Sequence, residues 1–480
     1  MILSIDIGTT TCKAALFDVS GVMSELTKVP LGMVSVAGGA QETEPREWSR
    51  ALQALCAQLT DKKRIRAVVV SGNGPTVVPV FGVPRVEGTL LHAPAGKARL
   101  WLDRRAVTEA REISAYTGHF IDASFVLPQV LHMSRNDPSI YQKSMCFLSS
   151  FEYVVYLMTG ISHAILHAED ARRWYWTDDL LDHFGLDAKK FPRLLSPGSL
   201  VGELSIHASE TLGLSQGIPV FSAGPDFLVS ILGCAVTEVG MACDRSGTSE
   251  GINLCARSPL ADDRLMSYLH PVSPFYNISG IISTTGKALR WVQELLGLEH
   301  LSFPQLYALA AQAPPGSNNL VFLPYLQGER APIWNPDARG VFSGLSLSSG
   351  RAELVRAVIE GTCMAVRDVI RVMEELDGQV TLLRVTGGPS ESPFMNQLKA
   401  TIVGRPVSVP AVRDAELVGA MVMARTALGD YDSVAQAAQE LVSVEETWEP
   451  ESSLEPLYDE VFDRYRKTYE QLKDTWRSQQ

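Results

Sequence analysis

The chain has 480 residues, of which 46% are hydrophobic and 20% are charged, and it carries a formal net charge of −12. This length is too great for one compact core and predicts an enzyme of two lobes. The acidic balance argues against nucleic acid or an anionic membrane as a partner, because both attract basic surfaces, and it favours a small-molecule substrate.

The N-terminus enters a predicted strand at once, without a basic leader segment, and no apolar run reaches the roughly 18 residues that span a membrane. We therefore expect a cytoplasmic protein. The histidines show no metal-ligand spacing, since His163 and His167 stand in a segment that reads as a strand passing into a loop. The cysteines form no Cys-x-x-Cys pair and are expected to be reduced and buried: Cys12, Cys56, Cys146, Cys234, Cys243, Cys255 and Cys363.

The first predicted element is a β-hairpin from Met1 to Asp18, with a turn that combines Gly8 and three threonines. A glycine beside hydroxyl side chains lets the backbone approach a phosphate closely, so this turn favours phosphate binding. Asp6 ends the first strand, where its carboxylate suits a Mg²⁺ ion that bridges phosphate oxygens. The same residues also suit an ordinary hairpin turn.

A helix and a strand are expected after this hairpin. Apolar residues recur at helical spacing between Pro45 and Leu59, and the apolar run from Arg66 to Val70 predicts a buried strand.

The segment Gly224-Pro225-Asp226 lies between a strand expected over Ile218 to Phe221 and an apolar helix expected over Leu228 to Ala235. The carboxyl end of a strand is where α/β folds place functional groups. Asp226 is therefore a candidate functional carboxylate. The alternative is a helix N-cap, a common position for Asp that contributes about 1 kcal/mol.

A second copy of the phosphate-binding pattern occurs at Asp244 to Ser249, again in a hairpin, which begins at Met241. A helix over Gly286 to Leu296 and a strand over Val321 to Leu323 follow, in the same order as in the first half. The two halves therefore resemble diverged repeats, with domains predicted over residues 1–240 and 241–480. Two such loops favour a nucleotide held between two domains.

The last third contains a strand that ends in the paired glycines Gly387 and Gly388, before a helix expected over Phe394 to Ile402. Paired glycines let a flat ring or a ribose pack against the backbone, although a plain strand-to-helix turn has the same composition. The tail from Leu457 to Trp476 predicts a charged amphipathic helix that serves as a surface or capping element.

These motifs, in this order, resemble the FGGY family of carbohydrate kinases. The most specific match runs from Phe322 through Gly328-Glu329-Arg330 to Pro332, and continues through Asn335 to Gly340 and on to Glu360-Gly361. The resemblance implies an α/β fold of two ribonuclease H-like lobes, as in actin and hexokinase, which close over ATP and a sugar in the cleft between them.

The resemblance also implies roles for individual residues. Asp226 matches the catalytic base that takes the proton of a sugar hydroxyl, and Asp6 matches the carboxylate associated with Mg²⁺. The residues implied on the ATP side are Thr9, Thr10, Thr11 and Lys13 in the first phosphate loop, Gly247 and Thr248 in the second, Gly286 beside the nucleotide, and Gly387 and Gly388 in the adenosine turn.

The sugar side is implied by two segments. One is the loop that contains Gly72 and Asn73, and the other is a Trp-x-Asp segment in which Trp101 covers a sugar face while Asp103 and Arg104 bind hydroxyls. The alternative for the second segment is the charged start of a surface helix.

The chain also departs from related patterns. Xylulose kinases usually carry Met-His-Gly where this chain has Gly72-Asn73-Gly74, and an amide residue where Phe227 follows Asp226. The Arg-Glu pair typical of glycerol kinases is absent. A pentulose such as xylulose is the leading substrate prediction, and the alternatives are glycerol, erythritol, gluconate, or a sensor without catalysis. An actin-like ATPase is disfavoured by the Gly328-Glu329-Arg330 run. The resemblance also admits a homodimer.

Overall fold

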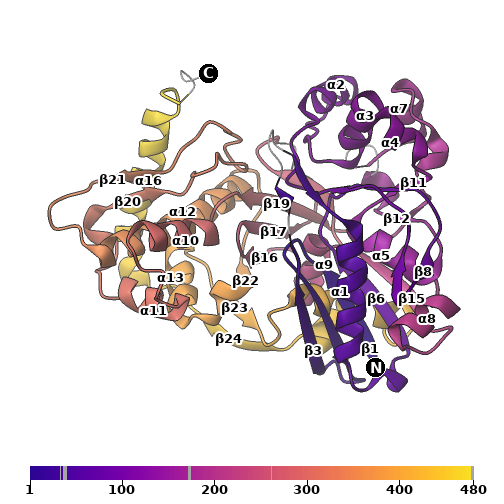
Figure 1. Ribbon diagram of the computed structural model, residues 1–480. Coiled ribbons are helices and arrows are strands. Elements are labelled where there is room, and N and C mark those ends of the chain that lie inside the picture. Colours follow the sequence, from indigo (N-terminus) through magenta and orange to yellow (C-terminus); the bar gives the residue numbers. More distant parts are fainter. Residues whose placement is uncertain (33, 36–39, 171–174, 261, 477–480) are drawn as a thin grey trace. The chain divides into compact units, whose positions relative to one another are not determined.

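The computed structural model describes residues 1–32, 34–35, 40–170, 175–260 and 262–476 (Figure 1). Its contacts divide the chain into unit 1, made of Met1–Ala235 and Glu416–Leu441, and unit 2, made of Val236–Ala415 and Val442–Gln480. The predicted boundary after residue 240 lies close to the first change of unit. The predicted domains differ from these units at Glu416–Leu441, which belongs to unit 1 because its helices pack there.

Unit 1 is built on a six-stranded sheet in the order β14-β15-β6-β1-β2-β3, in which β6 runs parallel to both β1 and β15. Its strands are β1 (Ile2–Ile7), β2 (Thr11–Phe17), β3 (Met23–Pro30), β6 (Ala67–Gly72), β14 (Ser199–Glu203) and β15 (Pro219–Pro225). Shorter strands form small sheets beside it: β4 (Val34–Ser35), β5 (Gln41–Thr43), β7 (Val78–Val80), β8 (Arg85–Glu87), β9 (Leu90–His92), β10 (Ala98–Arg99), β11 (Cys146–Leu148), β12 (Ala164–Ile165) and β13 (Leu194–Leu195).

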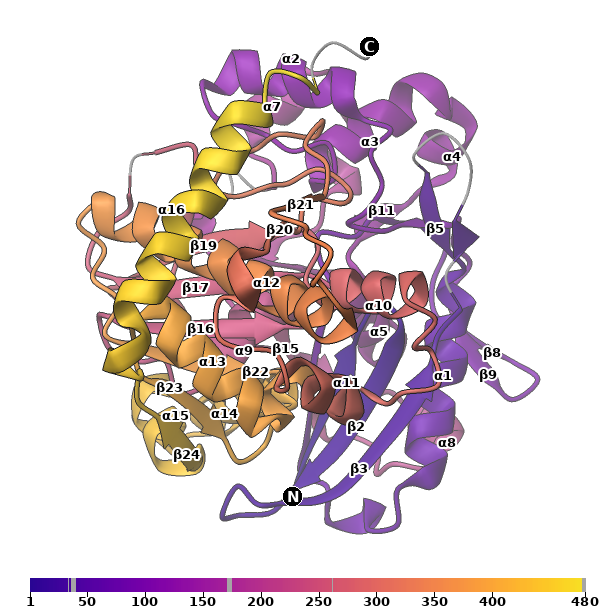
Figure 2. The same ribbon diagram turned by 90° about the vertical axis from the view of Figure 1, so that its left-hand side faces the viewer.

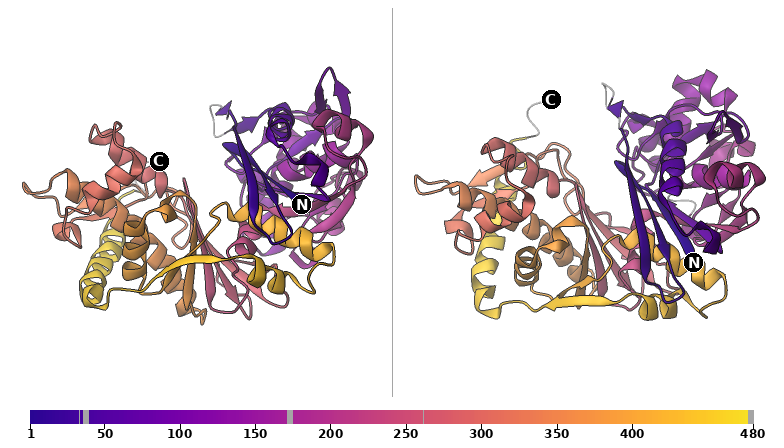
Figure 3. Two further views of the ribbon diagram at one scale, coloured as in Figure 1. Left: turned by 90° about the horizontal axis from the view of Figure 1, so that it is seen from below. Right: turned by 60° about the horizontal axis from the view of Figure 1, so that its bottom comes forward.

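Alternation along β1 decides what covers each face of this sheet. Leu3, Ile5 and Ile7 join the core cluster that includes side chains of α1, while Ser4 on the other face donates to the carbonyl of Leu417 in α14 at 2.8 Å. Figure 3 shows α14 and α15, in orange, beside the indigo strands. The helices are α1 (Pro45–Gln58), α2 (Val107–Thr117), α3 (Val126–Asn136), α4 (Pro138–Lys143), α5 (Ser150–Thr159), α7 (Asp178–His183), α8 (Ile206–Leu212), α9 (Asp226–Gly233), α14 (Ala415–Ala427) and α15 (Val434–Leu441).

Unit 2 is built on a seven-stranded sheet in the order β18-β19-β17-β16-β22-β23-β24. Its strands are β16 (Met241–Ser246), β17 (Glu250–Ala256), β18 (Met266–Leu269), β19 (Tyr276–Ile282), β22 (Leu382–Thr386), β23 (Val407–Pro410) and β24 (Val444–Trp448), with β20 (Val321–Leu323) and β21 (Val341–Ser343) as a separate pair. The helices are α10 (Gly286–Leu295), α11 (Phe303–Ala310), α12 (Arg351–Glu375), α13 (Pro393–Val403) and α16 (Glu455–Leu472). Figure 2 shows α16, in yellow, along the outside of this helical layer.

The two sheets repeat one arrangement. In unit 1 the hairpin β1-β2 is joined by the parallel strand β6, and in unit 2 the hairpin β16-β17 is joined by the parallel strand β22. The prediction that Val321–Leu323 is the counterpart of the strand after the first helix is wrong, because β20 pairs only with β21 among the described residues. A short apolar run does not reveal which sheet it joins. The counterpart of β6 is β22, which follows α10, α11 and α12 in unit 2.

Most local predictions are confirmed. Both hairpins form, α1 and α10 lie within one residue of their predicted limits, and all seven cysteines are buried free thiols. The predicted tail helix is α16, and it buries Tyr458, Val461 and Tyr465 in the core cluster of unit 2. Within the described ranges, we find no helix that combines the length and the apolar character needed to cross a membrane.

We expect Gly419→Ala to destabilise unit 1, although alanine normally favours a helix over glycine. A Cβ atom at Gly419 in α14 would lie 1.9 Å from the carbonyl oxygen of Val229 in α9, so the two helices would have to separate. The expected loss is about 2 kcal/mol or more, measured by denaturant unfolding. Gly32→Ala is the matched control, because a Cβ there meets nothing within 4 Å. Equal stability of the two variants would contradict this packing.

Candidate active site

Three parallel strand ends in unit 1 bring the predicted carboxylates together. The register pairs Asp6 of β1 with Ser71 of β6, and it pairs Gly72 of β6 with Pro225 of β15, directly before Asp226. Carboxyl ends of parallel strands share one sheet edge, which is where α/β folds bind ligands. The structure therefore places Asp6, the loop that begins at Gly72, and Asp226 at one edge of a single sheet.

Asp226 is the first residue of α9, and Pro225 occupies the N-cap position without any side-chain cap. The alternative reading of Asp226 as an N-cap is therefore wrong. Its side chain is half-buried. A carboxylate in the first turn is stabilised by the positive end of the helix.

Asp6 is almost fully buried and accepts a hydrogen bond from the Ser71 hydroxyl at 3.2 Å. Burial raises the pKa of Asp6 well above its usual value, and the nearby charges of Glu416 and Asp226 raise it further, while Lys13 opposes them. The carboxylates thus concentrate negative potential at the sheet edge, which a divalent cation would relieve. Among the described residues, no three such ligands are placed to hold a metal by themselves.

Glu416 is a residue that the sequence analysis missed. It stands in the first turn of α14, and its Oε1 atom lies 2.5 Å from the ammonium of Lys13 on β2. Lys13 stands opposite Asp6 in the register of the β1-β2 hairpin. No local signal marks Glu416, because it is 403 residues from Lys13 and only the tertiary structure brings them together.

The first phosphate loop is the turn between β1 and β2. A Cβ atom on Gly8 would lie 2.4 Å from the carbonyl oxygen of Thr11, so this tight turn requires glycine. Thr10 is exposed, and Thr9 is half-buried and accepts a hydrogen bond from the indole nitrogen of Trp101 at 3.0 Å. A predicted sugar-side residue thereby contacts a predicted phosphate-side residue.

Asn73 is buried, and its amide is engaged within the protein. Its Nδ2 atom donates to the carbonyl of Ile7 at 2.7 Å, and its Oδ1 atom accepts from the Thr76 hydroxyl at 2.6 Å. A Cβ atom on Gly72 would come within 2.9 Å of the Ile7 side chain. Asn73 therefore anchors its loop to the end of β1, beside the first phosphate loop.

The Trp-x-Asp segment contains both a buried side chain, which bonds within the protein, and more accessible ones. Asp103 is fully buried and accepts hydrogen bonds from the backbone of Gln41 at 3.0 Å and from the Arg105 guanidinium at 2.7 Å. Burial acts to raise the pKa of Asp103, but these donors outweigh it and lower that pKa. Arg104 forms an ion pair with Asp122 and keeps an exposed fraction of 39%. Trp101 and Arg104 are thus more accessible than Asp103.

In unit 2 the predicted nucleotide residues converge from three elements. The amide of Gly286, at the start of α10, donates to the carbonyl of Gly247 at 3.1 Å. Added Cβ atoms would lie 2.3 Å from Gly247 O at Gly286, and 1.9 Å from Ser246 O at Gly387, whose φ is +89°. Only glycine permits both approaches. The second phosphate loop, the start of α10 and the adenosine turn therefore pack directly on one another, and Gly388 remains exposed.

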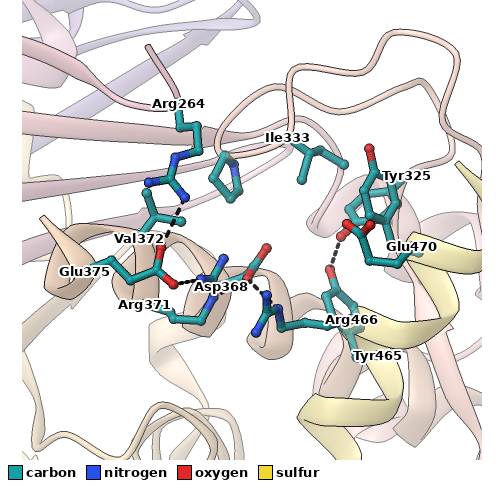
Figure 4. Close-up of a pocket in the computed structure, with 12 residues that line it drawn as sticks. Arg264, Tyr325, Ile333, Asp368, Arg371, Val372, Glu375, Tyr465, Arg466 and Glu470 are labelled. Atoms are coloured by element: carbon teal, nitrogen blue, oxygen red, sulfur yellow. Dashed lines mark hydrogen bonds and ion pairs between the residues drawn. The ribbon is translucent and has the colours of Figure 1, made fainter. Parts of the chain in front are cut away.

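A cavity of about 30 Å³ lies beside this convergence and is lined by Ser246, Thr285, Gly286 and Pro389, among others. A larger cavity of about 330 Å³ in the same unit contains none of the predicted site residues. Figure 4 shows that it is framed by ion pairs such as those of Arg371 with Asp368 and Glu375. The larger cavity is therefore not the candidate site. The candidate residues lie instead at the strand ends of unit 1 and at the glycine contacts of unit 2.

Comparison with known proteins agrees with this arrangement. Residues 1–233 match the N-terminal domain, and residues 245–428 the C-terminal domain, of the FGGY family of carbohydrate kinases. The xylulose kinase of Staphylococcus epidermidis is 27% identical, over 98% of this chain and 97% of that protein. The erythritol kinase of Brucella abortus is 28% identical, over 99% of this chain and 97% of that protein.

The fold is shared as well. The crystal structure of a ligand-bound xylulose kinase from Lactobacillus acidophilus matches with a TM-score of 0.86 and 22% identity, over 99% of each chain. Both domain models of the family thus match this chain, and each match contains one of the two predicted phosphate loops. This chain belongs to the FGGY family of carbohydrate kinases.

Proposed function

We propose that this enzyme transfers the γ-phosphate of ATP to a primary hydroxyl of a small sugar, and that the sugar is a pentulose such as xylulose. The observation that carries the proposal is the shared sheet edge in unit 1, where Asp6, the Gly72 loop and Asp226 meet. A second phosphate loop in unit 2 supplies the other half of the nucleotide contacts. Similarity to xylulose kinases along nearly the whole chain supports the choice of sugar.

Asp226 acts as the general base in this proposal. It accepts the proton of the attacking hydroxyl as the oxygen approaches the γ-phosphorus, so its main task is to orient the nucleophile. The start of α9 is a rigid position for such a group, because the preceding strand and the following helix both fix its backbone. Closure over the substrates would exclude water, which competes as a nucleophile.

The phosphates are bound by backbone amides and hydroxyls. Thr9, Thr10, Thr11 and Lys13 contribute from unit 1; Gly247, Thr248 and Gly286 contribute from unit 2; and Gly387 and Gly388 hold the adenosine. Mg²⁺, when bound, neutralises charge on the phosphate oxygens. Asp6 fits this ion because it is one carboxylate near two others, and Mg²⁺ in kinases takes one or two carboxylates and completes its shell with phosphate and water.

On the sugar side we assign direct contact to Trp101, Arg104 and Asp226. Asn73 and Asp103 are buried and use their polar atoms within the protein, so we assign them to positioning the two sugar loops, together with Gly72. This revises the predicted roles of Asn73 and Asp103 as direct hydroxyl contacts. The cytoplasmic location and the homodimer stay predictions from the sequence.

A second acceptor class is favoured by one observation. The erythritol kinase of Brucella abortus is 28% identical to this chain, a value close to the 27% of the xylulose kinase of Staphylococcus epidermidis. A linear polyol is therefore the main alternative, and a substrate panel separates it from a ketose.

We expect Asp226→Asn to lower kcat by at least about 10³-fold, because general base catalysis contributes about 10²–10⁴-fold and the amide also misplaces the nucleophile. The KM for ATP should change less than about twofold, since Asp226 does not bind the nucleotide in this proposal. ADP release with Mg-ATP is measured across pentuloses, hexuloses, linear polyols and aldonates.

The matched control for that variant is Asp178→Asn, because Asp178 is also the first residue of a helix, α7, and is exposed. It should leave all constants unchanged. ADP release stimulated by one sugar in the wild type but not in Asp226→Asn supports both the kinase and its base. Stimulation by no compound despite ATP binding would replace the kinase with a sensor.

Chelation of Mg²⁺ is expected to abolish ADP release, and Asp6→Asn should raise the Mg²⁺ concentration for half-maximal activity by about tenfold or more. The reason is that an amide oxygen carries no net charge to attract the ion. Titration of Mg²⁺ at saturating ATP and sugar measures the effect. An unchanged Mg²⁺ requirement in Asp6→Asn would remove Asp6 from the metal site.

Trp101 offers a separate test of the sugar face. Trp101→Phe keeps an aromatic face but loses the hydrogen bond to Thr9, so the KM for ATP should rise about fivefold while the KM for sugar changes little. Trp101→Ala should raise the KM for sugar as well. Steady-state kinetics with each substrate varied separates the two effects, and equal sugar KM values for both variants would exclude a covering role for the indole.

A further inference from the structure

Lys399 of α13 is a buried lysine to which the proposed mechanism assigns no task. Its residue exposure is 5%, yet its ammonium reaches the hairpin that carries the second phosphate loop. The Nζ atom lies 2.9 Å from Ser246 Oγ and 2.5 Å from Glu250 Oε1, and it also contacts Asp244 Oδ2. Each of its three protons therefore has one acceptor.

The acceptors lie together because of the strand geometry. Asp244 and Ser246 are two residues apart on β16 and share a face, and Ser246 pairs with Glu250 across the hairpin. All three are buried. The turn from Gly247 to Ser249 carries the proposed phosphate contacts. It joins the two strands immediately after the pair formed by Ser246 and Glu250.

The contacts of Ser246 favour a cluster in which one carboxyl group is protonated. Its hydroxyl oxygen lies 3.1 Å from Asp244 Oδ1 and 2.8 Å from Glu250 Oε1, but a hydroxyl carries a single hydrogen. Two full hydrogen bonds form if one carboxyl group carries a proton and donates it to Ser246, whereas two ionised carboxylates would have to share the one hydroxyl hydrogen. The serine oxygen then accepts from that carboxyl and from Lys399, and it donates to the other carboxylate.

Asp244 is the carboxyl that keeps the proton. Burial and the neighbouring Glu250 raise the pKa of Asp244 well above its usual value. Burial also acts to raise the pKa of Glu250, but the charge of Lys399 and the hydrogen bonds with Asp244, Lys399 and Ser246 together outweigh it and lower that pKa. Cys363 of α12 and Tyr307 of α11 also face the cluster, and burial raises the pKa of each to about 12. The cluster therefore holds one cation and one anion.

We propose that Lys399, Glu250 and a protonated Asp244 form an electrically neutral buried cluster that fixes the second phosphate loop in its ATP-binding conformation. This rests on the proposed function, which assigns ATP phosphates to Gly247 and Thr248. The physical reason is that an uncompensated carboxylate under the loop would repel the phosphates and each charge would lose its hydrogen-bond partners. Lys399 is thus a positioning residue.

Four proteins test the cluster: the wild type, Asp244→Asn, Lys399→Met, and Lys399→Met combined with Glu250→Gln. Asn places an N–H where the inferred carboxyl proton stands and keeps an oxygen for Lys399, so Asp244→Asn should bind Mg-ATP within about twofold of the wild type. Lys399→Met leaves Glu250 uncompensated, and its Kd for Mg-ATP at pH 8 should rise by at least about tenfold, because breaking a buried pair is costly.

The double variant restores neutrality, and its Kd should return to within about threefold of the wild type. If Lys399 had a purely structural role, the double variant would bind Mg-ATP no more tightly than Lys399→Met does. Lowering the pH from 8 to 6 should improve Mg-ATP binding by Lys399→Met, because the uncompensated Glu250 carboxylate then takes up a proton. The KM for sugar should stay unchanged in every variant.

Calorimetric binding of Mg-ATP and thermal unfolding without nucleotide are measured for all four proteins. The inference is overturned if Asp244→Asn weakens binding as much as Lys399→Met, if the double variant shows no recovery, or if Lys399→Met lowers only the unfolding midpoint. Should Lys399→Met not fold, Asp244→Asn and the double variant decide the question by the same criteria. A wild type that binds no ATP overturns the proposed function instead, while the unfolding midpoints still test the neutral cluster.

Discussion

The parallel pairing of each hairpin with the next strand of its sheet is the constraint on which the two halves of the site depend. In unit 1, β6 lies between β1 and β15, so three carboxyl ends open on one edge. In unit 2, β22 lies beside β16, so the proposed adenosine turn begins where the proposed second phosphate loop begins. Backbone hydrogen bonds fix this register, and the functional side chains inherit their positions from it.

Glycines allow segments of backbone to contact one another directly at three places near the proposed site. The turn at Gly387 and the start of α10 at Gly286 both press on the carbonyls of the second phosphate loop, and α14 presses on α9 at Gly419. The last contact lies behind the helix that begins with Asp226. The packing that stabilises unit 1 therefore also fixes the backbone of the proposed base.

Charge is arranged alike under both loops but with different consequences. Unit 1 combines Asp6 and Glu416 with Lys13, and the half-buried lysine and glutamate leave the group partly open. Unit 2 combines Asp244 and Glu250 with Lys399, and there all three are enclosed. An open group retains charge with which to meet a cation, whereas an enclosed group must balance its own charge because it is cut off from water.

The sequence alone was sufficient for the hairpins, the glycine turns that close them, the helix that follows Asp226 and the family, because glycines, hydroxyls and apolar periodicity are local signals. It did not reveal that β22, rather than Val321–Leu323, is the parallel neighbour of β16, since a short apolar run suits either sheet. Nor did it show that Asn73 is enclosed, or that Glu416 and Lys399 stand beneath the loops. Those facts depend on which distant side chains share one buried volume, and only the tertiary structure sets the distances that decide hydrogen bonding and charge.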